Sequence, residues 1–346
     1  MSSWNQRRVL VTGGASFIGS HLTERLVRLG ADVRVADDLS SGTLANLDAV
    51  RDDIELLPVD LRDPATTARA VAGREVVFHL AADHGGRGYI EQHRTACSSN
   101  FALDQAVFAA ALDGGCDQVT FASSACVYPV GLQADVDETV ALAEEHVGPP
   151  YDPDGLYGMA KLAAELTLAA MSADHGIATA SCRYFTVYGP RNPESHGLAA
   201  MVARAFVGED PFEVWGTGHQ RRNWTHVDDI VRGTVLAAER MTDGAVNLGA
   251  TTTRSVLEAA ELVLELTGHQ AAIRPLPDKP TGPLNRVADG TRARRLLDFT
   301  PEVPFESGLA GMIDWYAATH DRDQVRRDLE RRLLQRVEVD GPAAPG

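Results

Sequence analysis

The sequence predicts an α/β protein with a Rossmann-type, doubly wound parallel sheet and a smaller α/β lobe. Apolar runs alternate with helical patterns in the first half of the chain, and a glycine-rich turn follows the first run. With 44% hydrophobic residues among 346, the chain can also bury a sizeable core. We expect strands at residues 8–11, 33–36, 54–59, 76–80, 119–122, 178–184 and 246–249.

Helical patterns fill the intervals between these runs. Phe17–Leu29 follows the first strand and Asn100–Leu112 precedes the fifth, and each interval has room for a right-handed crossover. After Tyr184, proline and glycine become frequent and the alternation stops, which indicates a second lobe. We expect a first domain at residues 1–189 and 226–250, a second lobe at 190–225 and 251–320, and a charged helix with a disordered tail at 321–346.

Composition narrows the partners and the compartment. The net charge of -16 argues against nucleic acid or an anionic membrane as a partner. The four cysteines show neither a CxxC pair nor a ligand-like spacing with histidines, so we expect no metal site and no disulfide framework. No apolar run approaches the ~18 residues of a membrane span. A cytoplasmic protein without a membrane partner is therefore expected.

The turn after the first strand reads TGGASFIG at residues 12–19. Glycine tolerates positive φ and lets backbone approach a phosphate, and the helix that follows directs N–H groups toward a pyrophosphate. Gly13 and Gly19 fit the GxxGxxG form, whereas Ser16 takes the middle position. The turn predicts a dinucleotide site. An ordinary glycine turn before a helix is the alternative.

Acidic residues close the next two strands. Asp37 stands where a carboxylate accepts hydrogen bonds from the adenosine ribose and repels a 2′-phosphate, which favours NAD over NADP. Asp38 follows, and no arginine comes directly after it. Asp60 ends the third strand, from which it could reach the adenine amino group, although a turn-capping role is the alternative.

A tyrosine and a lysine form a candidate catalytic pair. Tyr157 and Lys161 lie one helical turn apart on the same face, and Lys161 is one of only two lysines in the chain. The ammonium is expected to lower the tyrosine pKa from about 10, so that the phenol takes a hydroxyl proton while a hydride leaves for NAD. Ser124, after Ser123 at the end of the fifth strand, could hold or relay this proton, unless the two serines only cap the strand.

Several motifs together carry a family resemblance. In chain order they are TGGASFIG, the Asp37 strand end, HLAA at 79–82, ASS at 122–124, YxxxK at 157–161, and RYF at 183–185 followed by YGP at 188–190. Over residues 7–318 this order resembles the extended short-chain dehydrogenases/reductases that modify nucleotide sugars. The resemblance implies NAD as cofactor, a nucleotide-diphosphate sugar as substrate, a substrate-binding second lobe, and a homodimer formed through two helices per subunit. It assigns Tyr157 as base, Lys161 as its activator and a cofactor ligand, and Ser124 as the third member.

The same resemblance implies the binding residues. Arg222 and Arg286 would contact the diphosphate, since guanidinium forks suit anionic oxygens, with ordinary surface arginines as the alternative. Thr186 stands where several relatives have asparagine. The cofactor contacts implied are Gly13, Ser16, Phe17, Ile18, Asp37, Asp38, Leu39, Ser40, Asp60, Leu61, Leu80, Ala81, Ala82, Asn100, Ser123, Tyr157, Lys161, Tyr184 and Val187. The substrate contacts implied are His84, Gly85, Gly86, Arg87, Ser124, Ala125, Cys126, Thr186, Arg222 and Arg286.

Within the family, three segments look most like GDP-mannose 3,5-epimerases: LAADHGGRGYI at 80–90, SSACVYP at 123–129 and EVWG at 213–216. In that subgroup a cysteine at the place of Cys126 acts as acid and base at C5, and in related 4,6-dehydratases a glutamate stands there. Oxidation at C4 makes the C3 and C5 hydrogens acidic, because the carbanion is delocalised into the ketone, so a second base can remove one. A small buried hydrophobe is the alternative for Cys126.

One departure from that subgroup concerns the second acid/base. The epimerases pair their cysteine with a lysine after the YGP motif, whereas residues 191–197 contain none and Lys279 lies in another segment. His196 could replace this lysine as proton donor or acceptor near neutral pH, or it is an exposed loop histidine. Single epimerisation at C5 or C3, or loss of water, needs fewer groups than double epimerisation.

These observations predict an NAD-dependent nucleotide-sugar epimerase that forms a transient 4-keto intermediate and exchanges a proton at C5 and/or C3. A 4,6- or 5,6-dehydratase is an alternative, as is a plain C4 epimerase that needs only Ser124, Tyr157 and Lys161. A non-catalytic NAD-sensing regulator is disfavoured because it has no need of YxxxK and the adjacent serine. The sequence names neither the base nor the hexose.

Overall fold

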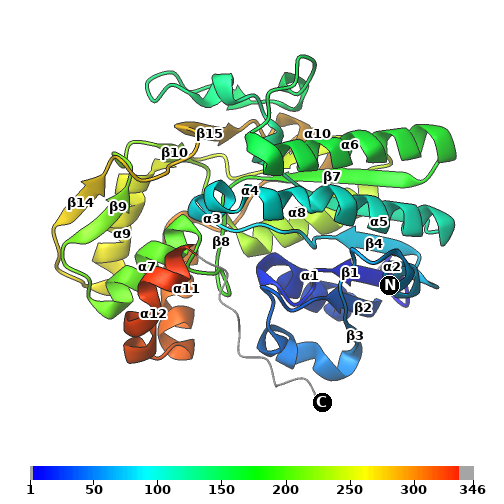
Figure 1. The fold of residues 1–346 in the computed structure, drawn as a ribbon, viewed down its shortest axis with the longest axis horizontal. Coiled ribbons are helices and arrows are strands. Elements are labelled where there is room, and N and C mark those ends of the chain that lie inside the picture. Colours follow the sequence, from blue (N-terminus) through cyan, green and yellow to red (C-terminus); the bar gives the residue numbers. More distant parts are fainter. Residues whose placement is uncertain (1–2, 335–346) are drawn as a thin grey trace.

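The computed structural model describes residues 3–334 and is built around one seven-stranded parallel sheet (Figure 1). The strand order is β12-β7-β5-β4-β1-β2-β3, and every neighbouring pair is parallel. The predicted doubly wound sheet is confirmed. Its strands are β1 (Arg8–Thr12), β2 (Asp32–Asp37), β3 (Ile54–Pro58), β4 (Val76–His79), β5 (Gln118–Ser124), β7 (Ala178–Tyr184) and β12 (Ala245–Leu248).

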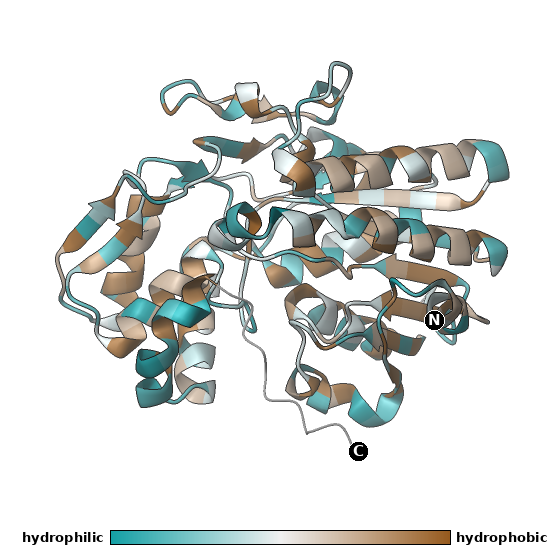
Figure 2. Ribbon diagram, in the orientation of Figure 1, coloured by the Kyte–Doolittle hydropathy of each residue, from teal (hydrophilic) through white to brown (hydrophobic). Residues whose placement is uncertain are grey.

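Helices cover both faces of this sheet, which is why its strands read as continuous apolar runs. Alternate residues of β1 pack into different layers: Val9 and Val11 meet α1 and α8, whereas Leu10 faces α5 and α6. All three side chains are fully buried, and Figure 2 shows the strands of the sheet as predominantly hydrophobic. The covering helices are α1 (Phe17–Arg28), α2 (Pro64–Val71), α5 (Asn100–Asp113), α6 (Gly155–His175) and α8 (Val227–Arg240).

The strand order changes direction at β1, which has β2 on one side and β4 on the other. In open α/β sheets, ligands bind in the crevice at the carboxyl ends of the strands on either side of such a switch point. Thr12, at the end of β1, pairs in register with His79, at the end of β4. The glycine-rich turn and the loop beginning at Leu80 therefore leave the sheet side by side.

A second lobe packs beside the carboxyl ends of the strands (Figure 1). Its core includes Val202, Phe212, Leu309 and Met312, all nearly inaccessible to solvent. Its elements are α7 (Gly197–Val207), β9 (Phe212–Trp215), β10 (Arg221–Arg222), β13 (Arg254–Ser255), α9 (Val256–Thr267), β14 (Ile273–Leu276), β15 (Asn285–Ala288), α11 (Phe305–Thr319) and α12 (Arg322–Leu334).

The chain crosses between the lobes more often than the predicted boundaries imply. Helix α10 (Thr291–Leu297) falls in the predicted second lobe, yet Ala293 and Leu297 pack against Cys182 and Val246 of the main sheet. Strand β6 (Ala141–Leu142), from the predicted first domain, pairs with β15. The other short elements are η1 (Leu44–Asp53), α3 (Arg87–Gln92), α4 (Arg94–Ser98), η2 (Ala125–Val127), η3 (Val130–Gln133), η4 (Glu144–His146), β8 (Val187–Tyr188) and β11 (Thr225–His226).

The predicted charged C-terminal helix is part of the second lobe. In α12, Val325 is buried in the lobe core, and the Arg326 guanidinium donates to the carbonyl of Val207 at the end of α7. Residues 335–346, including the predicted tail, lie outside the described residues. Over residues 3–334, no helix is both long and apolar enough to cross a membrane.

Candidate active site

The glycine-rich turn fits tightly against the loop that follows β4. Gly13 has φ +68°, and a Cβ there would lie 2.8 Å from the Ala81 nitrogen. A Cβ on Gly19 would lie 2.0 Å from the Gly13 carbonyl oxygen. The Ser16 hydroxyl donates to the same oxygen at 2.6 Å. Serine at the middle position therefore braces the turn, and both flanking glycines are required sterically.

Asp37 is fixed at the edge of a cavity of about 130 Å³ beside this turn. Its carboxylate accepts hydrogen bonds from the backbone N–H of Ala15 at 2.9 Å and of Leu39 at 2.8 Å. Burial raises the pKa of Asp37. The structure brings most of the predicted cofactor residues together here. The lining includes Gly13, Ser16, Asp37, Asp38, Ser40, Asp60, Leu61, Leu80, Ala81 and Ala82, together with His84, which we predicted as a substrate contact.

Asp60 has a partner that the sequence reading missed. Arg62 lines the same cavity, and its guanidinium donates two hydrogen bonds to the Asp60 carboxylate. Nη2 lies 2.7 Å from Oδ2, and Nε lies 2.9 Å from Oδ1. The hydrogen bond from Arg62 holds the pKa of Asp60 below its usual range. The Asp60 charge therefore neutralises Arg62, which is the one arginine among the described residues that line this cavity. The 2′-phosphate of NADP would find no unpaired cation among these described lining residues.

The side chains of three predicted cofactor residues are bonded elsewhere in the protein, so any contact they make with the cofactor would come from their backbone. Asn100 has no exposed surface, and both ends of its amide bind the backbone of Asp83. The Ser123 hydroxyl donates to buried Glu165, and the Tyr184 hydroxyl pairs with that of Thr234 at 2.9 Å. Four others, Phe17, Ile18, Leu39 and Val187, pack in or against the apolar cluster around α1 and α8.

Tyr157 and Lys161 lie on α6, as predicted, and both are almost completely buried. The Lys161 Nζ is 5.8 Å from the centre of the Tyr157 ring and 4.4 Å from that of Phe121, while the Ser124 hydroxyl is near enough to act on the pKa of the Tyr157 phenol. Burial raises the pKa of Tyr157 and lowers that of Lys161. The expected lowering of the tyrosine pKa is therefore not present in the protein chain alone, because desolvation outweighs the ammonium.

Cys126 lies next to this pair, in the turn η2 directly after β5. Its side chain packs with Tyr157, Tyr89 and Cys97, and the Cys126 backbone N–H donates to the Ser124 hydroxyl at 3.2 Å. The Arg286 Nη1 donates to the sulfur at 3.2 Å. Cys126 also lines the larger cavity described below. The thiol thus has a cationic partner and faces a space that a ligand can enter.

His196 differs from both of our interpretations. It is partly buried rather than exposed, it precedes α7 as the N-cap residue, and its ring stacks on His84 at 5.8 Å between centres. Burial lowers its pKa to about 4, so the ring is uncharged at neutral pH. A neutral ring can accept a proton but is not a cationic donor near neutral pH, and the predicted proton-exchange role stays a prediction. His84 in turn meets the edge of Tyr157, with ring centres 6.1 Å apart.

A larger cavity of about 240 Å³ lies between the two lobes. Among the predicted substrate contacts it is lined by Arg87, Cys126, Thr186, Arg222 and Arg286. It is not lined by Gly85, Gly86, Ser124 or Ala125; Gly85 lies against Tyr89, and Ala125 is buried in a small apolar cluster. A Cβ on Gly86 would lie 1.6 Å from the carbonyl oxygen of Ser195. The glycine thus lets this loop approach the cavity wall.

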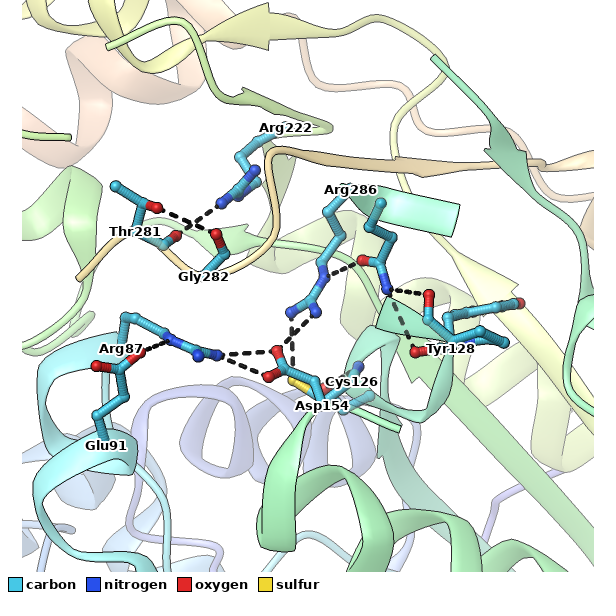
Figure 3. Close-up of polar contacts among 12 residues, drawn as sticks. Arg87, Glu91, Cys126, Tyr128, Asp154, Arg222, Thr281, Gly282 and Arg286 are labelled. Carbon is cyan, nitrogen blue, oxygen red and sulfur yellow. Dashed lines mark hydrogen bonds and ion pairs between the residues drawn. The ribbon is translucent and has the colours of Figure 1, made fainter. Parts of the chain in front are cut away.

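Two arginines enter the cavity from neighbouring strands. Arg222 of β10 and Arg286 of β15 are register partners, so their side chains share one face. Arg222 donates to the carbonyl oxygen of Thr281 at 3.0 Å (Figure 3). It also donates to the carbonyl oxygen of Arg221 at 2.7 Å. Burial, with the like charges of Arg286 and Arg87, lowers the pKa of Arg222 to about 9. It is still a cation at neutral pH and favours an anionic ligand.

Asp154 is a site residue that the sequence reading missed. Its carboxylate accepts hydrogen bonds from Arg87 and Arg286, all at 2.9 Å (Figure 3). The sequence did hold a signal, since an aspartate at the start of a helix is ordinarily an N-cap. Here the N-cap carboxylate makes no bond to its own helix and is used by the arginines instead.

Helix α12 supplies a wall of the same cavity, which the predicted boundaries did not anticipate. Leu333 lines it, and the neighbouring Arg332 donates to the Glu194 carboxylate at 2.7 Å. Glu194 also accepts from the Tyr316 hydroxyl at 2.8 Å. The end of the helix is thereby tied to the segment that leads into α7.

The profile of the NAD dependent epimerase/dehydratase family matches residues 9–249. The chain belongs to this family. A UDP-N-acetyl-alpha-D-glucosaminuronate decarboxylase of Bacillus cytotoxicus is 31% identical over 90% of this chain and 98% of its own length. GDP-mannose 3,5-epimerase 1 of Oryza sativa subsp. japonica is 30% identical over 96% of this chain and 85% of its own. The dTDP-glucose 4,6-dehydratase DesIV of Streptomyces venezuelae, solved with NAD, has a TM-score of 0.82 at 26% identity and covers 90% of this chain and 97% of its own.

NAD is the cofactor of this member of the epimerase/dehydratase family. The residues present fit the dinucleotide: Gly13 leaves the space that a Cβ would fill, and buried Asp37 presents a carboxylate at the end of β2. Within residues 3–334, no three His, Cys, Asp or Glu side chains are grouped so that they could hold a metal ion.

Proposed function

We propose that this enzyme is a nucleotide-sugar epimerase that forms a transient C4 ketone and exchanges a proton at C5 and/or C3. The observation that carries the proposal is the position of Cys126. Its sulfur lies in the larger cavity, next to Tyr157 and hydrogen-bonded to Arg286. A plain C4 epimerase has no use for an acid/base at this place.

The first half of the reaction belongs to Tyr157, Ser124 and Lys161. Tyr157 takes the proton of the C4 hydroxyl, Ser124 lies near the phenol and would hold or relay this proton, and Lys161 supplies positive charge from the same helix. NAD, held by the glycine-rich turn and Asp37, would supply the hydride acceptor for C4. Burial raises the pKa of Tyr157 in the chain alone, so the base needs positive charge nearby, which Lys161 and the oxidised nicotinamide would supply.

The second half belongs to Cys126. The sulfur removes the hydrogen of C5 or C3 as a proton, and the C–H electron pair moves into the ketone as an enolate. Return of a proton to the opposite face inverts that carbon, and return of hydride to C4 ends the cycle. His196 is uncharged at neutral pH, so the incoming proton must come from another group or from water.

The cavity fits a nucleotide-diphosphate sugar. Arg222, whose guanidinium donates to backbone carbonyl oxygens, would bind the diphosphate. Its register partner Arg286 donates to the Cys126 sulfur, so Arg286 would lie at the sugar end of the same cavity. Apolar residues such as Trp215, Trp224, Met201 and Val256 line the remainder of the cavity.

A homodimer would form through α5 and α6, which pack against each other and present exposed apolar side chains. Those on α6 are Leu156, Met159 and Leu166, and Phe101 lies on α5. Large apolar side chains gathered on neighbouring helices mark a protein interface. This arrangement agrees with the two-helix dimer that the family resemblance implies.

The test is isotope exchange in deuterated water. The NAD-loaded enzyme is incubated with GDP-mannose, UDP-glucose and dTDP-glucose, and deuterium is located by NMR. Label at C5 or C3 of an epimerised sugar is the expected result. A 6-deoxy or alkene product assigns a dehydratase, whereas C4 inversion without label assigns a plain C4 epimerase. Tyr157→Phe should abolish every product, because no step precedes the C4 oxidation.

A further inference from the structure

At the Cys126 end of the larger cavity, the lining arginines Arg87 and Arg286 are neutralised by carboxylates just behind the cavity wall. Arg87 Nη1 donates to both oxygens of Asp154 at 2.9 Å, and its Nε donates to Glu91 at 2.7 Å. Arg286 Nη2 donates to Asp154 at 2.9 Å. Two guanidinium groups therefore face two carboxylates here, in the row that Figure 3 shows from Glu91 to Arg286.

The diphosphate end of the cavity differs. Among the described residues, the partners of the Arg222 guanidinium are backbone carbonyl oxygens, those of Arg221 and Thr281, and no carboxylate lies within ion-pair distance of it. Its positive charge is therefore not neutralised by the protein. An anion entering this cavity is attracted to the Arg222 end and meets no net charge at the Cys126 end.

Asp154 cannot easily turn away from its arginines. It is only 7% exposed, its backbone N–H donates to the Cys126 carbonyl at 2.8 Å, and its carbonyl accepts from Gly158 N–H at 3.2 Å. Burial alone would raise the pKa of Asp154, but Arg286 and Arg87 more than offset this and hold it below its usual range. The carboxylate is therefore ionised at neutral pH and fixed beside the reacting cysteine.

We infer that Asp154 makes the enzyme select a neutral hexose over a hexuronate as the sugar of its substrate. This inference rests on the proposed function, since it places the sugar beside Cys126. A second carboxylate there would lose its hydration in a buried site that offers no net positive charge to compensate, and it would lie near the fixed negative charge of Asp154. The arginines that could have recognised it are already paired with Asp154 and Glu91.

The selection has a chemical consequence. Oxidation of a hexuronate at C4 gives a β-keto acid, in which the C5–C6 bond breaks, its electron pair enters the ketone as an enolate, and carbon dioxide leaves. A neutral hexose has no carboxylate at C6 and cannot follow this route. Asp154 therefore separates this chain from the decarboxylation named for its Bacillus cytotoxicus relative, and it favours epimerisation or loss of water.

The test compares the binding of sugars that share a base. Calorimetry on the NAD-loaded enzyme gives the Kd of UDP-glucose and UDP-glucuronic acid, and of GDP-mannose and GDP-mannuronic acid. Within each pair that binds, the ratio of uronate Kd to neutral Kd should be at least about tenfold in the native protein, since a tenfold ratio needs only 1.4 kcal/mol. Asp154→Asn should lower this ratio at least tenfold, because it frees two guanidinium groups.

Three further variants complete the comparison. Asp154→Glu retains the charge and should keep the native preference, and Asp152→Asn removes an exposed carboxylate two residues away and should change nothing. Arg87→Met leaves Asp154 with less positive charge around it and should raise the ratio further. This last variant tests the inference even where Asp154→Asn fails to fold.

Equal or tighter binding of the uronates by the native protein would overturn the inference, as would an unchanged ratio in a folded Asp154→Asn variant. The binding measurements need no turnover, so the two proposals can fail separately. If the protein prefers neutral sugars but exchanges no deuterium, only the epimerase proposal fails. If it exchanges deuterium into a uronate substrate, only the proposed selection of a neutral hexose fails. Failure to bind any of the four sugars would overturn both.

Discussion

The guanidinium of Arg286 donates a hydrogen bond to the sulfur of Cys126 at 3.2 Å, although the two residues are 160 positions apart in the chain. Arg286 is also the register partner of Arg222, which would bind the diphosphate from the neighbouring strand. The proposed acid/base and the proposed diphosphate site are thus held by two paired strands of one sheet. The position of the sugar against the sulfur therefore follows from how the diphosphate is held.

Cys126→Ser tests the acid/base role directly. Deuterium wash-in at C5 or C3 should fall by about 10²- to 10⁴-fold, the usual contribution of a general acid/base, because a serine hydroxyl ionises far less readily than a thiol and so supplies almost no base. Reduction of bound NAD by the sugar nucleotide should still be detectable by absorbance, since C4 oxidation uses Tyr157. Cys182→Ser, at a buried cysteine of the main sheet, is the matched control. Exchange at the native rate in Cys126→Ser would contradict the role.

His196 should make stability depend on pH. Its pKa of about 4 in the folded protein lies below its ordinary value of 6.5, so the unfolded chain binds a proton that the folded chain does not between these values. Stability contributed by the neutral ring is therefore complete above pH 6.5 and is lost as the pH falls toward 4. Urea unfolding at pH 7 and pH 5 should show His196→Asn losing about 1–2 kcal/mol less than the native protein between the two. Equal losses would show that the ring is not sequestered.

Thr186 carries backbone strain at the cavity wall. Its φ of +33° lies in the left-handed region, which a β-branched residue rarely adopts and asparagine tolerates. Thr186→Asn should raise the free energy of unfolding by about 1 kcal/mol, measured by denaturant titration. Thr251→Asn, at an exposed position where φ is not positive, should leave it unchanged. Loss of stability in Thr186→Asn would mean that the threonine contacts outweigh the strain.

Leu333 should contribute to sugar-nucleotide binding although it lies on the C-terminal helix. Leu333→Ala removes an apolar part of the cavity wall and should raise KM for the sugar nucleotide by about tenfold, for a loss of about 1.4 kcal/mol. The Kd for NAD should not change, because NAD binds at the other cavity. Leu329→Ala trims the same helix where it packs on the lobe core. If Leu329→Ala raised KM as much as Leu333→Ala does, both effects would come from a general loosening of α12 and not from the cavity wall.

The apolar face of α6 should hold two copies of the chain together. Leu166→Arg places a charge among exposed apolar side chains and should convert a dimer to a monomer in sedimentation velocity. Leu266→Arg, at an exposed leucine on α9 of the second lobe, should leave the assembly unchanged. A native protein that sediments as a monomer at micromolar concentration would remove the dimer proposal.

Local patterns predicted much of the fold and part of the site. The apolar runs gave the strands of the main sheet to within two residues at each end, because strands buried on both faces are continuous apolar segments. Gly13, Asp37 and the Tyr157–Lys161 pair lie where their motifs indicated, since each depends on a turn, a strand end or a single helical turn. Asn100, Ser123 and Tyr184 were assigned by motif position alone, and that does not reveal which way a side chain points.

The sequence by itself determined what neighbouring residues decide: the parallel strands, the glycine turn and the four-residue spacing of the tyrosine and lysine. Only the tertiary structure decided that Arg87, Asp154 and Arg286 meet, over separations of 67 and 132 residues. It also decided that Leu333 closes the cavity and that His196 is uncharged at neutral pH. The reason is physical, because contact and desolvation depend on which distant segments pack together, and no local pattern carries that information.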